Sequence, residues 1–188
     1  MNARGFYLAS AAALLVGVSP STASIPNESV RLVQNPIEWR IFASREGRFQ
    51  VMLPTPPETH TEAVNLPGQS ISLHTFAAND SQSEYLITYS DYPQEFITQL
   101  GEPTQFLQSV KQGFLSGIQA NEDFSMVLRL DGYPGLEVEY TTAEGTIGFA
   151  RFYLVNSRLY QVIATSRGVE SGSFPENADR FLTSFALQ

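Results

Sequence analysis

Short stretches in which apolar and polar residues alternate make up most of the chain, and this period of two is typical of β-strands with one buried face. Residues 48–53 show it most simply, because Phe49, Val51 and Leu53 fall on one side. Glycine- and proline-containing turn signals separate the stretches. The predicted strands are residues 38–44, 48–53, 58–65, 69–77, 83–89, 124–130, 136–141, 146–155 and 158–165.

The period changes to that of a helix in two places. In the first, apolar residues recur at spacings of three and four, and Thr104 after Pro103 is the predicted N-cap. The apolar stripe of this helix consists of Phe106, Leu107, Val110, Phe114 and Ile118. A shorter helix opens at residues 174–176, and its stripe consists of Ala178, Phe181, Leu182 and Phe185.

The order of these elements predicts an α+β fold, in which a central antiparallel β-sheet of about six to eight strands carries helices packed on its faces. Connections of hairpin length favour antiparallel neighbours. Residues 146–155 are apolar on both sides except at Arg151, so we expect this strand to be covered on both faces.

The N-terminus has the pattern of a cleaved secretory signal peptide. Arg4 precedes an apolar run over residues 6–18, and the small residues Ser21 and Ala23 follow it. The run is too short for the roughly 20 apolar residues that span a bilayer. We therefore predict a signal peptide over residues 1–23, an extended lead over 24–37, a single domain over 38–188, and no transmembrane segment after cleavage.

Composition and charge exclude several classes of protein. The chain has 11 basic and 19 acidic residues, a formal net charge of −8, and no cysteine. Nucleic-acid binding needs clustered basic residues, and Lys111 is the only lysine. Without cysteine, a disulfide scaffold, a thiolate metal site, an iron–sulfur cluster and a thiol nucleophile are all excluded.

The two histidines, His60 and His74, lie on the two arms of one predicted hairpin, where they could hold a metal ion if they faced each other. A two-residue loop at Pro67 and Gly68 pairs Leu66 with Gln69 and turns the histidines to opposite faces. A three-residue loop would pair them directly. The first register suits the proline–glycine turn, and we predict no metal site.

Glu137, Glu139 and Arg151 form a second candidate site. Two carboxylates two residues apart on a strand satisfy the spacing of a glycosidase pair. A three-residue turn over 143–145, however, places Arg151 opposite Glu137. We therefore predict a cross-strand ion pair here, and no catalytic residues.

Tyr89, Asp91 and Tyr92 end a strand in the segment Tyr-Ser-Asp-Tyr-Pro and form a candidate partner or ligand surface. The plain alternative is a strand capped by tyrosines, with Asp91 bonded to local backbone in a turn. No serine elbow appears, and the glycine-rich segment 131–135 joins two strands, so it is interpreted as a turn and not as a phosphate loop. No cofactor site is predicted.

Several short motifs together resemble the PsbP-like family. They are the export signal and residues 47–54 (Gly-Arg-Phe-Gln-Val-Met-Leu-Pro), 132–135 (Gly-Tyr-Pro-Gly) and 181–185 (Phe-Leu-Thr-Ser-Phe). The resemblance covers roughly residues 38–188 and implies a sheet between helices and largely non-enzymatic roles. Family members in oxygenic phototrophs sit in the thylakoid lumen, attached to photosystem II or assisting its assembly; others are exported bacterial proteins of unknown function.

The sequence thus predicts an exported, non-catalytic accessory domain, located in the periplasm or the thylakoid lumen, whose partner is a membrane-associated protein complex. The alternative is a small-molecule or lipid binder with a pocket between sheet and helix. That pocket would be lined by Phe106, Phe114, Phe149 and Tyr153.

Overall fold

The computed structural model describes residues 38–66, 69–99, 101–166 and 174–188. The predicted signal peptide and extended lead lie outside the described residues. The strands are β1 (Arg40–Ser44), β2 (Phe49–Leu53), β3 (Glu58–Leu66), β4 (Gln69–Asn79), β5 (Ser83–Asp91), β6 (Ala120–Leu130), β7 (Tyr133–Thr142), β8 (Ile147–Val155), β9 (Arg158–Ser166) and β10 (Ala186–Leu187). The helices are α1 (Gln94–Gln99), α2 (Pro103–Gly117) and α3 (Phe174–Ser184).

Seven strands form one antiparallel sheet in the order β3-β4-β5-β9-β8-β7-β6. The predicted α+β class is therefore confirmed. The first two strands do not join this sheet; they pair with the C-terminal β10 in a separate three-stranded sheet, β1-β2-β10. Pro54, Pro56 and Pro57 separate β2 from β3, and proline cannot donate to a ladder, which explains why the strands divide here.

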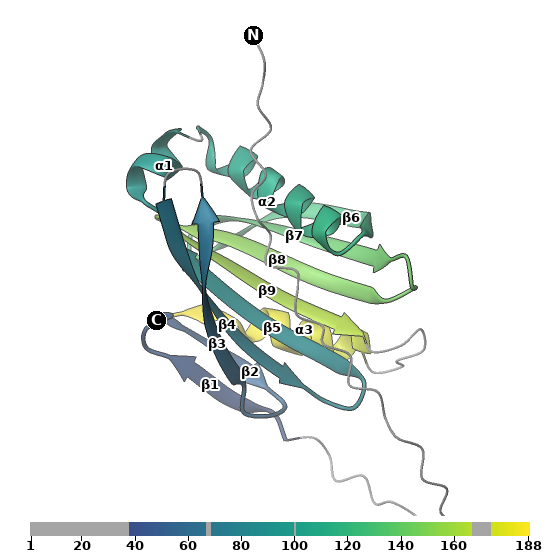
Figure 1. Ribbon diagram of the computed structural model, residues 1–188. Helices are drawn as coiled ribbons and strands as arrows, with labels where there is room; N and C mark the ends of the chain where they lie inside the picture. Colours follow the sequence, from purple (N-terminus) through teal and green to yellow (C-terminus); the bar gives the residue numbers. More distant parts are fainter. Residues whose placement is uncertain (1–37, 67–68, 100, 167–173) are drawn as a thin grey trace, which may run out of the picture.

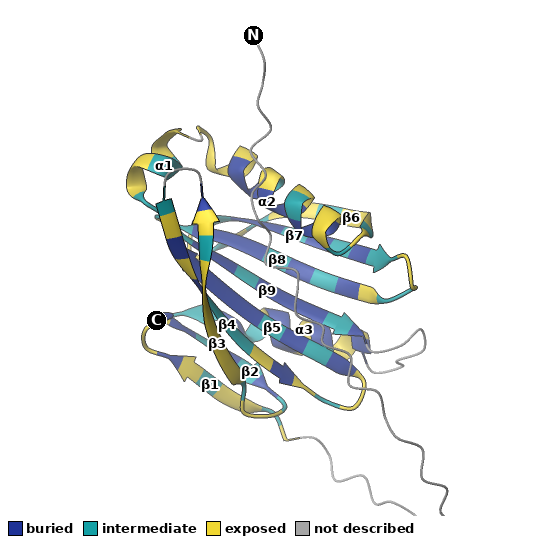
Figure 2. Ribbon diagram, in the orientation of Figure 1, coloured by how far each residue is buried: buried dark blue, intermediate teal, exposed yellow. Residues whose placement is uncertain are grey.

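The large sheet is covered on both faces (Figure 1). Helix α2 packs across β7 and β8 on one face, while α3 and the small sheet pack on the other. Buried residues accordingly run along β8 and β9 at the centre of the sheet (Figure 2). Phe152 faces α2 and Tyr153 faces α3, so β8 is buried from both sides, as its apolar sequence predicts.

The turns between neighbouring strands place Asp, Asn and Gly at the positions that need a positive φ. Asp131 and Gly132, with φ of 50° and 86°, join β6 to β7 in a two-residue turn that suits the twist of a hairpin. Asn156, with φ 56°, opens the turn between β8 and β9. Gly145, with φ 84°, closes the predicted turn over 143–145.

The start of α2 differs from the prediction. Glu102 and not Thr104 is the N-cap residue, and its side chain makes no capping hydrogen bond. Pro103 takes the first helical position, where its missing N–H costs nothing. Sequence periodicity also missed α1 and β10, which are too short to show a period. Within the described ranges, no helix combines the length and the apolar character needed to cross a membrane.

Candidate functional site: a polar pocket at the strand ends

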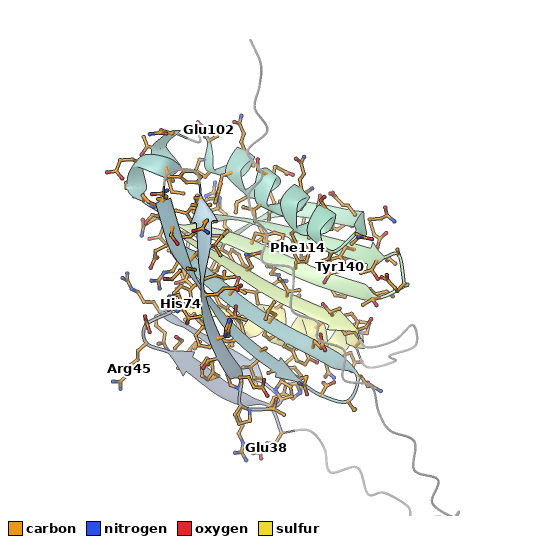
Figure 3. The ribbon with its side chains drawn as sticks, in the orientation of Figure 1. Glu38, Arg45, His74, Glu102, Phe114 and Tyr140 are labelled. Carbon is orange, nitrogen blue, oxygen red and sulfur yellow. The ribbon has the colours of Figure 1, made fainter. Side chains whose placement is uncertain are left out.

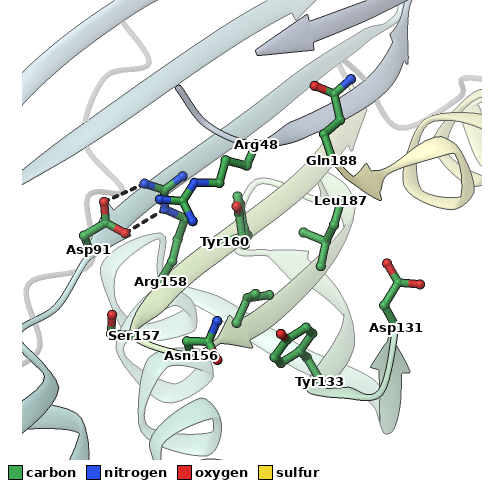
Figure 4. Close-up of a pocket in the computed structure, with 11 residues that line it drawn as sticks. Arg48, Asp91, Asp131, Tyr133, Asn156, Ser157, Arg158, Tyr160, Leu187 and Gln188 are labelled. Carbon is green, nitrogen blue, oxygen red and sulfur yellow. Dashed lines mark hydrogen bonds and ion pairs between the residues drawn. The ribbon is translucent and has the colours of Figure 1, made fainter. Parts of the chain in front are cut away.

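A polar pocket of about 460 Å³ lies where five separate parts of the chain meet. It is bounded by the β1–β2 turn, the end of β5, the β8–β9 turn with the start of β9, and the β6–β7 turn, and the C-terminal residues close it (Figure 4). Its lining residues are Arg48, Asp91, Asp131, Tyr133, Val155, Asn156, Ser157, Arg158, Tyr160, Leu187 and Gln188.

Arg158 is anchored in one wall of the pocket. It lies directly across from Asp91 in the β5–β9 pair, and its Nε and Nη2 donate to the two carboxylate oxygens at 2.6 Å each. Nη1 donates to the carbonyl of Glu46 at 2.9 Å, and the guanidinium lies 4.4 Å from the centre of the Tyr89 ring. The bidentate geometry fixes the side chain.

The charges around Asp91 keep it ionised. The hydrogen bonds from Arg158 are the main cause that holds the pKa of Asp91 below its ordinary value, and the charges of Arg158, Arg48 and His74 act in the same direction. A carboxylate held in this way is a weak base. The Asp91 carboxylate is therefore poorly suited to take up a proton.

Arg48 presents the second guanidinium of the pocket. Its φ of 52° lies in the left-handed region that a non-glycine residue seldom adopts. The turn is held from two sides, because Tyr160 Oη donates to the Gly47 carbonyl at 2.7 Å and the Gln188 amide donates to the Arg48 carbonyl at 3.0 Å. The Arg48 side chain is exposed and points toward Arg158 (Figure 4).

The pocket is lined by two guanidinium groups, those of Arg48 and Arg158, and by two carboxylates, those of Asp91 and Asp131. Arg158 forms an ion pair with Asp91, whereas no described carboxylate forms an ion pair with Arg48. The Asn156 side chain and the phenol of Tyr133 line the same space and can add neutral hydrogen bonds. A carboxylate or a phosphate is the chemistry that a guanidinium in this setting binds.

The three residues of the predicted partner surface separate in the structure. The Tyr89 side chain is buried, with its ring stacked on His74 at 4.4 Å. Tyr92 points to the other face of the sheet and stacks on Phe96 at 5.5 Å, and burial raises its pKa to about 12. Asp91 lines the pocket, bonded to Arg158 and not to local backbone. A binding role for Asp91 stays a prediction.

The histidines follow the two-residue-loop register. Leu66 pairs with Gln69 and His60 with Thr75, so the two imidazoles lie on opposite faces. His74 shares a hydrogen bond with Thr61 Oγ1 at 3.1 Å. Across the described ranges, no three histidine or acidic side chains gather into a set that could hold a metal ion.

The predicted ion pair between Glu137 and Arg151 is confirmed. The two residues are direct cross-strand partners, and Arg151 Nε lies 2.5 Å from Glu137 Oε2. Arg151 Nη1 also donates to the Leu182 carbonyl at 2.9 Å, so the pair fastens α3 to the sheet.

The prediction of a cavity between sheet and helix, lined by four aromatic rings, is wrong. Phe106 and Phe114 pack under α2, whereas Phe149 and Tyr153 lie on the opposite face of the sheet. Phe149 stacks on Phe174 at 5.7 Å and Tyr153 on Phe185 at 5.9 Å. Four rings divided between two faces cannot line one space.

Comparisons with known proteins give a fold and no sequence family. No protein-family model matches the chain, and no curated protein matches its sequence. The solution structure of cyanobacterial PsbP (CyanoP) from Synechocystis sp. PCC 6803 superposes with a TM-score of 0.53 at 15% identity, over 83% of this chain and 96% of that one. The fold is PsbP-like. A Pseudomonas aeruginosa protein of unknown function, PA94, aligns at a TM-score of 0.36 and 10% identity over 68% of this chain and 82% of that one.

Proposed function

We propose that this chain is an exported accessory domain that acts by binding a membrane-associated protein complex in the periplasm or the thylakoid lumen. The PsbP-like fold and the signal-peptide pattern of residues 1–23 support this proposal. CyanoP bears the name of a photosystem protein, and by this analogy of fold the complex is a photosystem or one of its assembly intermediates.

The polar pocket carries the proposal. Its Arg48 guanidinium is exposed and has no described carboxylate partner, and hydrogen bonds to the Gly47 and Arg48 carbonyls hold the turn that carries it. An exposed arginine beside the Asp91–Arg158 pair can recognise an anionic side chain or a C-terminal carboxylate of a protein. Binding at such a site needs no reaction.

An Arg48→Ala variant tests this function. The chain also offers a matched control, because Arg45 is an exposed arginine of the same turn whose side chain points away from the molecule (Figure 3). We expect the exported protein to co-purify with a membrane-associated complex, the Arg48→Ala variant to lose at least about tenfold in affinity, and Arg45→Ala to bind as before.

If both variants retained the complex equally well, the pocket would not be the site that binds it. Turnover of a substrate by the purified protein, abolished by a change in one acidic residue, would overturn the non-catalytic role itself. Circular dichroism of each variant keeps these outcomes separate from a loss of fold.

A further inference from the structure

The edge strand β6 carries an unusual amount of exposed apolar surface. It ends the seven-stranded sheet, so one side of its backbone has no neighbouring strand in the described part of the chain. Three of its side chains are large, apolar and about half exposed or more: Phe124 at 50%, Met126 at 46% and Val127 at 60%. Unpaired edges of this kind are templates for another strand.

The apolar side chains of β6 are exposed because the layer that contains α3 does not extend over this strand. Phe124, Met126, Leu128 and Leu130 face the side of the sheet on which α3 packs. Helix α3, however, contacts β9 and β2, so its cover ends before it reaches β6. The prediction that these four residues share a face is correct, but the outer two of them, Phe124 and Met126, stay about half exposed.

The opposite edge is built differently. Strand β3 exposes Glu58, His60 and Glu62 along one face, and a copy of β3 paired about His60 would bring Glu58 against Glu62. Like charges directly opposite each other destabilise a strand pair. This register of β3 is thus disfavoured, whereas residues 124–128 of β6 carry no charge.

We infer that β6 pairs with β6 of a second copy of this chain, antiparallel, about a two-fold axis that passes through Met126. In this register Met126 meets Met126, Phe124 meets Leu128, and Ser125 meets Val127 of the second copy. The regular stretch from Phe124 to Leu130, beyond the bulge between Glu122 and Phe124, supplies the ladder. Such an interface uses one patch twice and joins two sheets into one.

Charge complementarity selects this register. Arg129 of one copy lies opposite Asp123 of the other. A shift of the axis by one residue, to Val127, would place Asp123 opposite Asp131 instead. Opposite charges across a ladder favour the first register, and like charges disfavour the second. Phe124, Met126 and Leu128 of both copies then form one continuous apolar strip.

Because the chain contains no cysteine, a disulfide test is free of side reactions within the chain. In the full-length protein, Met126→Cys places two thiols across the two-fold axis, where cross-strand Cα atoms lie about 4.5–5.5 Å apart and can be bridged. We expect mild oxidation to give a covalent dimer. The control His60→Cys, an exposed position on edge strand β3, is expected to give no covalent dimer.

A second pair of variants measures the dimer without a crosslink. Met126→Lys puts two charges together at the axis, and we expect sedimentation to show a dissociation constant at least about tenfold higher than for the unaltered chain. Ile41→Lys is the matched control, since Ile41 is 68% exposed and lies on β1. It is expected to leave the dimer intact.

Three results would overturn the inference: a monomer at every concentration, a dimer that Met126→Lys does not weaken, or crosslinking of the Met126→Cys variant to a different exported protein. The last result would mean that β6 pairs with a strand from another protein. The inference does not depend on the proposed function, because the Arg48→Ala capture experiment and the dimer tests alter different residues.

Discussion

At the scale of single residues, Gly148 shows how closely the face under α2 is packed. It lies on β8 directly opposite Tyr140, and a Cβ at this position would overlap the tyrosine ring. Tyr140 has little freedom to move, since its Oη is 2.9 Å from Thr165 Oγ1 and its ring packs edge-on against Phe114 at 5.3 Å (Figure 3). We predict that Gly148→Ala lowers the free energy of unfolding by about 1–3 kcal/mol, as measured by urea denaturation.

A smaller residue at position 140 provides the control. In a Tyr140→Val background the added methyl group finds space, so the same Gly148→Ala change should cost clearly less. An equal cost in both backgrounds would show that the ring is not the obstacle. Sequence patterns predict the strand that contains Gly148, but they do not reveal which side chain crosses it.

At the scale of elements, Lys111 joins α2 to β6. The lysine is buried in the helix interface, and its Nζ lies 2.7 Å from Glu122 Oε2 and 3.2 Å from Ser125 Oγ. Glu122 and Ser125 are three residues apart and would point to opposite faces of a regular strand. The bulge between Glu122 and Phe124 places both on the face under α2. Periodicity could not predict this contact, because a bulge interrupts the period.

We predict that Glu122→Gln lowers the free energy of unfolding by about 1–3 kcal/mol near neutral pH, because it leaves the buried ammonium of Lys111 without a countercharge. Lys111→Met should cost less, since its apolar chain fills the same space and Glu122 can turn to water. Urea denaturation of both variants and of the double variant measures the coupling. A larger loss for Lys111→Met would contradict this account.

The pH dependence of the same pair has a definite sign. The hydrogen bonds from Lys111 and Ser125 lower the pKa of Glu122 from its ordinary value. A carboxyl whose pKa falls on folding contributes stability above its unfolded pKa and loses it as the pH falls through the folded value. The difference between the unaltered chain and Glu122→Gln should therefore shrink when unfolding is measured at about pH 3 instead of about pH 7.

At the scale of the whole molecule, local patterns predicted more of the fold than of the site. Hairpin pairings such as Glu137 with Arg151 follow from the length of one turn. The pairing of Asp91 with Arg158 joins residues 67 positions apart and depends on β9 lying beside β5, which no local signal specifies. Arg48 enters the pocket only because the small sheet, closed by β10, packs on the large one.

The boundary of the domain gives the last prediction. Trp39 packs edge-on against Tyr85 at 5.2 Å and lies 5.5 Å from the Arg180 guanidinium, and Phe42 packs on Phe76 at 5.5 Å. Trp39 and Phe42 therefore help to close the core. We expect the exported protein to have the mass of residues 24–188, and a chain beginning at residue 38 to unfold within about 0.5 kcal/mol of it in urea.

A chain beginning at residue 45 should lose about 3–5 kcal/mol, because it lacks both aromatic side chains and leaves β2 without its partner β1. Far-UV circular dichroism follows the three unfolding curves, since the only tryptophan is absent from the shortest chain. An equally large loss for the chain beginning at residue 38 would mean that residues 24–37 belong to the folded domain.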